Sequence, residues 1–294
     1  MLFLVAGLSS GVFAAGEVDP TFTTAAFTVQ NSGILAAAVQ TDGKIIVGGN
    51  FTVANGVARY GLARLNSNGT LDTSFDPPEF FDPSLTFGGI GGTIRVIALQ
   101  SNGKILVGGK FSLTGSNYRF LVRLNPNGSI DNTFANIQWS NSITNTEVRR
   151  IVVLPDDSFV IGGNFTVVGS NSASSQVAKF DANGNFNETF RMINFGGTLK
   201  DFAVQPDGKV FICDANIQRL NADGSVDNTF PIVATGGINR MILRPDGKLL
   251  IAGNFTTVNS FSQGRIALIN SDGSLDLNFN LNGLGADSGI GDII

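Results

Sequence analysis

Apolar and polar residues alternate in short runs along this chain, and one arrangement returns five times. The segment "ILAAAVQTDGKIIVGGNFT" (34–52) shows two apolar runs on either side of a polar turn. Close variants follow as "IRVIALQSNGKILVGGKFS" and "INRMILRPDGKLLIAGNFT". Asp-Gly and Asn-Gly between alternating runs favour tight hairpins, because glycine adopts positive φ at little cost. Each segment therefore predicts a β-hairpin.

A second turn follows each hairpin and completes the repeat. It is "LNSNGTLDTSF" in the first repeat and "LNPNGSIDNTF" in the second. Each repeat thus predicts four short strands, a to d, and four strands at this spacing are typical of a β-propeller. The predicted fold is all-β, a β-propeller of five four-stranded blades with strand a innermost. The blades are expected at approximately 33–75, 94–134, 148–190, 199–230 and 238–279.

The two halves of the repeat also carry a family resemblance. "ALQSNGKILVGGKFS" followed by "LVRLNPNGSIDNTF" resembles the bacterial delta-60 repeat family of β-propellers, and both halves recur in order over roughly 18–294. We therefore expect 18–294 to form a single propeller domain. The resemblance implies a secreted or surface-displayed bacterial protein, or a phage-borne one, and it implies no known catalytic residues.

At each end of the sequence, one part of the repeat occurs without the other parts. "VDPTF" (18–22) matches strand d, and "SGIGDII" (288–294) matches the start of strand a. This pattern predicts an incomplete sixth blade, whose unpaired edges invite another strand. Two explanations are favoured: the sequence is a piece of a longer protein, or another chain fills the edge. In a third, a five-blade ring closes and one end docks elsewhere.

Repeated glycines, phenylalanines and charges have structural interpretations. The pair Gly48-Gly49 and its equivalents suit a bulge or a close backbone approach at a strand end. Phe51, which follows the pair, and Phe75, which closes strand d, are expected to pack between blades. Pairing strands c and d around the second turn sets arginine opposite aspartate, which predicts structural ion pairs. These are Arg64 with Asp72, Arg123 with Asp131, and Arg219 with Asp227.

The long connections predict one variable face. The a–b and c–d turns are short and uniform, whereas the b–c and d–a connections are long and divergent, and alternate connections share a face. The fourth repeat, "KVFICDANIQRLN", has almost no b–c loop, so a notch beside Asp214 and Asn216 is expected there.

Large aromatic residues gather on the same predicted face. Such side chains suit sugar stacking and interface anchoring. The alternative is that each holds its own loop in place. The candidate ligand-binding residues are Tyr60, Phe80, Phe81, Tyr118, Trp139, Asp214 and Asn216.

Composition narrows the chemistry. The 294 residues contain no histidine, one cysteine and 14% charged residues, with a net charge of −4. Nucleic acid is therefore not an expected partner, and a buried, inert state is expected for Cys213. The apolar segment 1–17, whose first fifteen residues carry no charge, resembles a secretory signal or an apolar strand, and no later stretch resembles a membrane helix. No cofactor is expected; "NADGSVD" has oxygen ligands that could suit calcium, but a hairpin turn explains them.

Three classes of function are compatible with a β-propeller. The favoured one is a non-enzymatic extracellular module that binds a glycan or a protein through its variable face. The alternative is a structural subunit of a cell-surface or virion assembly, with self-assembly through faces or strand edges. The chain is predicted not to be an enzyme, because it has no histidine, no repeated acid outside structurally explained positions and no nucleophile with a base.

Overall fold

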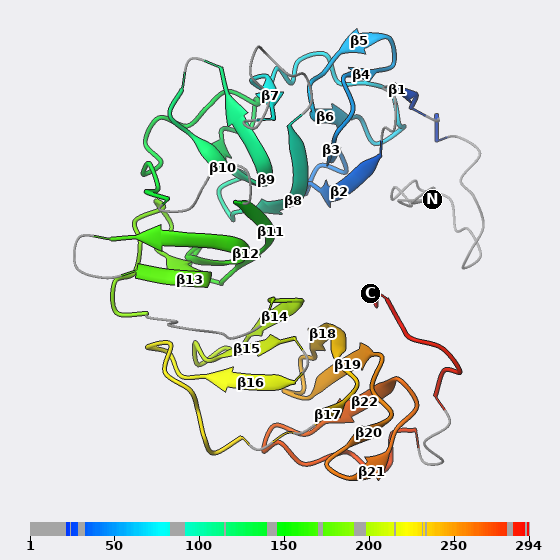
Figure 1. Ribbon diagram of the computed structural model, residues 1–294. Coiled ribbons are helices and arrows are strands. Elements are labelled where there is room, and N and C mark those ends of the chain that lie inside the picture. The colour runs from blue at the N-terminus through cyan, green and yellow to red at the C-terminus, as the bar shows by residue number, and fades with distance from the viewer. Residues whose placement is uncertain are drawn as a thin grey trace. The chain divides into compact units, whose positions relative to one another are not determined.

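The computed structural model describes residues 22–23, 25–28, 33–82, 92–114, 116–139, 146–169, 173–190, 198–214, 216–230, 232, 234–280, 285–291 and 293. This part of the chain is built of antiparallel strands and turns, which confirms the all-β prediction (Figure 1). Within these residues no helix is long and apolar enough to span a membrane. The apolar segment 1–17 lies outside the described residues.

The chain divides into two compact units. The first comprises Met1–Ile137, Asn141–Phe159 and Asp181–Asn185. In it β3 pairs with β2 and β6, β9 pairs with β7, β8 and β10, and β4 pairs with β1 and β5. Its strands are β1 (Phe27–Thr28), β2 (Ile34–Val39), β3 (Ile45–Gly49), β4 (Val53–Ala54), β5 (Val57–Ala58), β6 (Leu62–Leu65), β7 (Phe80–Phe81), β8 (Thr93–Leu99), β9 (Ile105–Leu113), β10 (Arg119–Leu124) and β11 (Glu147–Val153).

The second unit contains the remaining strands, together with all of β12 except its first residue. There β12 pairs with β13, β15 with β14 and β16, β19 with β18 and β22, and β20 with β17 and β21. These strands are β12 (Phe159–Val168), β13 (Ala173–Phe180), β14 (Asp201–Val204), β15 (Val210–Cys213), β16 (Ile217–Leu220), β17 (Ala234–Thr235), β18 (Ile238–Leu243), β19 (Leu249–Gly253), β20 (Thr257–Val258), β21 (Phe261–Ser262) and β22 (Ile266–Ile269).

Strand d is shorter than the sequence predicted. In the first repeat it is reduced to one bridge, Leu65 with Leu71, and the same single bridge recurs in the other repeats. The Asp72 carboxylate then accepts the N–H of Ser74 at 3.0 Å, and Phe75 donates its N–H to the Asp72 carbonyl at 3.4 Å. The chain turns away at once, so a repeat has three strands and a bridge.

The glycine pair forms a bulge, as predicted. Ile94 pairs with Gly109 and Val96 with Gly108, which leaves Arg95 as the extra residue of strand a. A Cβ on Gly109 would lie 2.1 Å from the carbonyl oxygen of Thr93, so only glycine fits. The same register shift occurs in the first and fifth repeats.

The phenylalanine that closes strand d packs on the next repeat. The ring of Phe75 lies 3.1 Å from the Cβ position of Gly128, and the neighbouring Asp76 donates its N–H to Asn127 at 3.3 Å. Phe22 makes the same contact with the turn of the first repeat, which agrees with the strand-d match of "VDPTF".

The C-terminal segment also follows the pattern. Ile290 donates its N–H to the Gly253 carbonyl at 3.0 Å, just as Ile238, at the start of strand a, donates to Asp214. Residues 18–21, 292 and 294 lie outside the described residues.

The predicted arginine–aspartate pairs are present, and each includes a lysine that sequence reasoning missed. Asp131 donates its N–H to the Arg123 carbonyl at 3.0 Å, which confirms the register. Arg123 Nε and Lys104 Nζ each lie 2.6 Å from Asp131 Oδ2. Arg123 also donates from Nη1 to the Ala182 carbonyl. Matching clusters are Arg64–Lys44–Asp72 and Arg219–Lys209–Asp227.

The variable connections are not independent loops. In the first repeat Phe27 on β1 pairs with Ala54 on β4, and its ring lies 4.8 Å from that of Phe51. The connection leading into a repeat therefore pairs with the b–c segment of that same repeat. The other pairs are β7 with β9, Trp139 with Val167, and β17 with β20.

Candidate functional site

The fourth repeat lacks the glycine pair. Its inner strands align with those of the second repeat through the pairs Val204–Val210 and Leu99–Ile105. Counting from these pairs, Cys213 and Asp214 take the positions of the two glycines. Asp214 carries a side chain where glycine is otherwise required, so the connection into β14 cannot approach β15 as closely.

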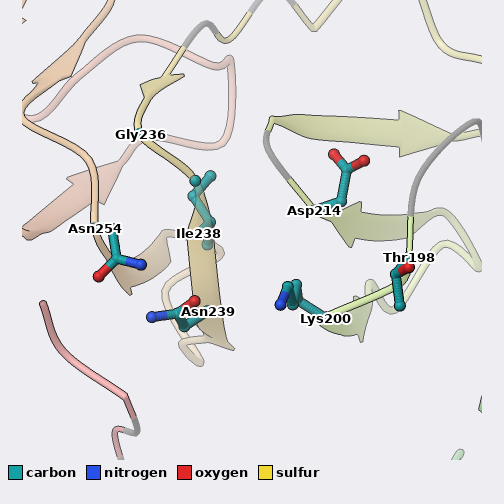
Figure 2. Close-up of a pocket in the computed structure, with 8 residues that line it drawn as sticks. Thr198, Lys200, Asp214, Gly236, Ile238, Asn239 and Asn254 are labelled. Carbon is teal, nitrogen blue, oxygen red and sulfur yellow. The ribbon is translucent and has the colours of Figure 1, made fainter.

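A pocket of about 390 Å³ opens at this point (Figure 2). It lies in the second unit, between the start of β14, the end of β15 and the start of β18. The notch predicted beside Asp214 is thus present, although Asn216 does not line it. The lining residues are Thr198, Lys200, Asp214, Gly236, Gly237, Ile238, Asn239 and Asn254.

Asp214 is fixed by its backbone. Its N–H donates to the Asn216 carbonyl at 3.1 Å, and its carbonyl accepts the N–H of Ile238 at 3.0 Å. Oδ1 accepts the N–H of Asn216 at 3.0 Å. No hydrogen bond to Oδ2 occurs within the described residues, so this oxygen can accept one from a ligand.

Thr198, Lys200, Asn239 and Asn254 provide the other polar side chains of the pocket. Lys200 and Asn239 come from the two neighbouring strand starts in Figure 2. Lys200 is exposed, and its ammonium makes neither a hydrogen bond nor an ion pair with any described residue. Asn239 is the bulge residue of the fifth repeat and donates its Nδ2 hydrogen to Ile290 at 2.8 Å. Its amide oxygen accepts no hydrogen bond within the described part of the chain. Neither residue was predicted, because no motif or repeat position distinguishes Lys200 or Asn239.

Cys213 lies behind the pocket rather than in it. The side chain is fully buried, and its sulfur lies 3.9 Å from the Ile238 carbonyl oxygen. Burial, with a further contribution from the Asp201 carboxylate, raises the pKa of the Cys213 thiol to about 12. The thiol therefore stays protonated at neutral pH, in agreement with the predicted inert state.

The aromatic candidates contact their own loops. Phe80 is 1% exposed, and its ring packs edge-on against Phe111 at 4.8 Å. Trp139, half-buried, packs edge-on against Phe165 at 5.6 Å. Tyr118 donates its hydroxyl hydrogen to the Phe134 carbonyl at 2.6 Å.

These contacts match the alternative in which the aromatic residues hold their loops. Tyr60 and Phe81 are half-buried. Phe261, at 51% exposure on the hairpin β20–β21, is the more accessible ring and was not among the predicted residues.

The candidate calcium segment forms a turn. Asp223 Oδ1 accepts the N–H of Ser225 at 2.9 Å and its hydroxyl at 2.7 Å. Among the described residues, no three Asp, Glu or Cys side chains gather closely enough to hold a metal ion.

The repeats of this chain match a known protein family. The sequence profile of a family described as "Domain of unknown function (DUF5122) beta-propeller" matches residues 40–75, 100–134, 154–190, 214–230 and 244–279. The chain belongs to this β-propeller family. The expected delta-60 resemblance is thereby supported at the level of a β-propeller repeat family. In the fourth DUF5122 repeat the match begins only at Asp214, beside the pocket. A comparison with curated proteins finds no match.

Several solved structures are similar to this DUF5122 propeller. Virginiamycin B lyase from Staphylococcus aureus aligns with a TM-score of 0.50 and 13% identity, over 85% of this chain and 70% of the lyase. PorZ, a surface component of the type-IX secretion system of Porphyromonas gingivalis, gives 0.48 and 16%, over 86% and 35%. YCF48 bound to D1 peptide gives 0.46 and 12%, over 84% and 68%. Identities this low show the fold alone.

The prediction that the chain is not an enzyme is wrong, because the fold does not exclude catalysis. A lyase shares the fold over most of the chain, and propellers host both binding and catalysis. The lack of histidine removes one kind of general base, but carboxylates, lysine and tyrosine remain available.

Proposed function

We propose that this DUF5122 propeller is a recognition module that holds a polar ligand, a glycan or a peptide segment, in the Asp214 pocket on its variable face. The observation that carries the proposal is the replacement of a bulge glycine by Asp214, beside which the pocket opens. The Lys200 ammonium, the free Asp214 oxygen and the Asn239 amide oxygen provide donors and acceptors for such a ligand. A bacterial cell surface or extracellular location fits this role, with a virion as the alternative.

Binding arrays test the proposal. Labelled protein is applied to glycan and peptide arrays, and each ligand found is titrated against Lys200→Met and Asp214→Asn. We expect either substitution to weaken binding by about tenfold, as the loss of one hydrogen bond to a charged group would. Bound ligands are also analysed by mass spectrometry, because chemical change would indicate catalysis at the pocket.

The matched control is Arg244→Met. It removes the same charge from an exposed residue on a uniform a–b turn. Ligands that bind the wild type and both pocket variants equally well would exclude the pocket as the recognition site.

A structural role is the second candidate, because β2 presents apolar side chains to solvent. Leu35 is 44% exposed and Val39 is 52% exposed, and both belong to the same face of this strand. Contiguous apolar surface of this kind suits contact with another sheet. Assembly in solution that is lost in Leu35→Lys, measured by light scattering, would favour this candidate.

A further inference from the structure

Two arginines of the first unit share one carboxylate. Arg95 Nε lies 2.5 Å from Glu147 Oε1, and Arg149 Nε lies 2.9 Å from Glu147 Oε2. The Glu147 side chain is 11% exposed, whereas those of Arg95 and Arg149 are 43% and 49% exposed. The carboxylate is therefore enclosed, and the two guanidinium groups reach solvent.

The outer edges of both guanidinium groups are free. Within the described residues neither Arg95 nor Arg149 makes a hydrogen bond through Nη1 or Nη2. The structural arginines differ: Arg123 is 2% exposed and also donates from Nη1 and Nη2 to protein groups. Arg64 likewise donates from Nη1 to the Pro126 carbonyl at 2.6 Å.

The backbone sets this geometry. Arg95 is the bulge residue of β8, and bulges re-aim a side chain out of the regular ladder. Arg149 takes the equivalent place in β11, one residue after the apolar Val148, as Arg95 follows Ile94. Val148 and Ile94 occupy equivalent positions, because each packs against the first glycine of the glycine pair in the preceding repeat.

Charge favours an anionic ligand. Burial raises the pKa of Glu147, but the hydrogen bonds from Arg95 and Arg149 outweigh burial and lower the pKa below its ordinary value. Glu147 is thus ionised at neutral pH, and the three groups together carry one net positive charge.

We propose that Arg95 and Arg149, oriented by Glu147, bind an oxyanion, a carboxylate or phosphate group of a ligand, at the start of the inner strands. The Nη1–Nη2 edge of a guanidinium matches two oxygens of such a group in a bidentate arrangement. The inference does not depend on the Asp214 pocket, because it uses residues of the other unit.

Titration with two probes tests the site. Inorganic phosphate and glucuronate are titrated calorimetrically into the wild type at low ionic strength, where charged contacts are least screened. We expect saturable binding of at least one probe below about 50 mM, weakened about tenfold or more in Arg149→Met. Arg149→Lys keeps the positive charge but loses the paired N–H donors of the guanidinium, so it should also weaken binding.

The control is Arg119→Met, which removes another exposed arginine, at the start of β10, and should change affinity less than about twofold. Circular dichroism establishes that each variant is folded. Binding of phosphate alone or of glucuronate alone supports the site and identifies the group it prefers. Failure of both probes to bind, or equal binding by Arg149→Met, would overturn the proposal.

Discussion

Single side chains in this propeller act across hairpins. In the first, second, fourth and fifth repeats the turn lysine of the first hairpin reaches the aspartate that follows the second turn. Lys248 does so with Asp276 at 2.6 Å even though no arginine is present there. The third repeat lacks both partners at once, with Ser158 in the lysine position and Asn187 in the aspartate position. The lysine and the aspartate are therefore one structural unit.

Replacing Asp131 by asparagine should destabilise the fold. The change leaves Arg123 and Lys104 without their shared counter-charge, and breaking a buried ion pair costs about 3 kcal/mol or more. Urea unfolding measures the loss. Asp42→Asn is the control, because Asn102 naturally holds the same turn position in the second repeat and the change should cost less than about 0.5 kcal/mol. Equal losses in the two variants would contradict the proposed role of the cluster.

At the scale of elements, the variable face is ordered by pairing. Each described connection into a repeat contributes one aromatic or small residue that packs over the b–c segment, and Phe27, Phe80 and Trp139 occupy matching places. The sequence predicted that these segments share one face of the propeller. It did not predict that they pair, because two-residue strands have too short a pattern to recognise.

Trp139→Ala should lower stability by about 2 kcal/mol, since it removes the edge-on contact with Phe165 and leaves a gap under the loop. Trp139→Phe should retain most of the stability, because phenylalanine fills the same place in the first two repeats. Thermal unfolding measures both. If the alanine variant melts with the wild type while ligand binding falls, Trp139 is a recognition residue instead.

For the whole molecule, the repeated aspartates predict a response to acid. Burial raises the pKa of Asp72 and Asp131, but hydrogen bonds from the turn lysines and from Ser74 or Thr133 hold it well below its ordinary value. In Asp227 the hydrogen bond from Lys209 lowers the pKa.

The sign of the effect follows from these directions. Above about pH 5 the carboxylates are ionised in both the folded and the unfolded chain, and their stabilisation is complete. Below about pH 4 the unfolded chain takes up protons first, so the free energy of unfolding should fall steadily towards pH 2. Denaturant unfolding at several pH values measures the fall, which should be shallower in Asp131→Asn. A flat profile down to about pH 2.5 would refute the linkage.

The sequence alone predicted the structural features that depend on neighbouring residues or on the repeat. The turn around Asn66 and Thr70 fixed the register that sets Arg64 against Asp72, and the missing loop indicated the notch at Asp214. The sharing of Glu147 by Arg95 and Arg149 was not predictable, since it joins the first strands of two repeats and depends on a bulge that re-aims one side chain.

The pairing of the described connections with their own repeats also determines where segments of such a protein can be exchanged with a relative. Phe80 and Phe81 on β7 precede the second repeat but complete its b–c segment through Leu113 and Ser112. A transplanted repeat that begins at strand a would lack its own β7, so its b–c segment would lie against the incoming connection of the host protein instead. Exchange of a loop between relatives therefore conserves structure only when the junction lies just after the strand-d phenylalanine, so that the transplanted module begins near Asp76.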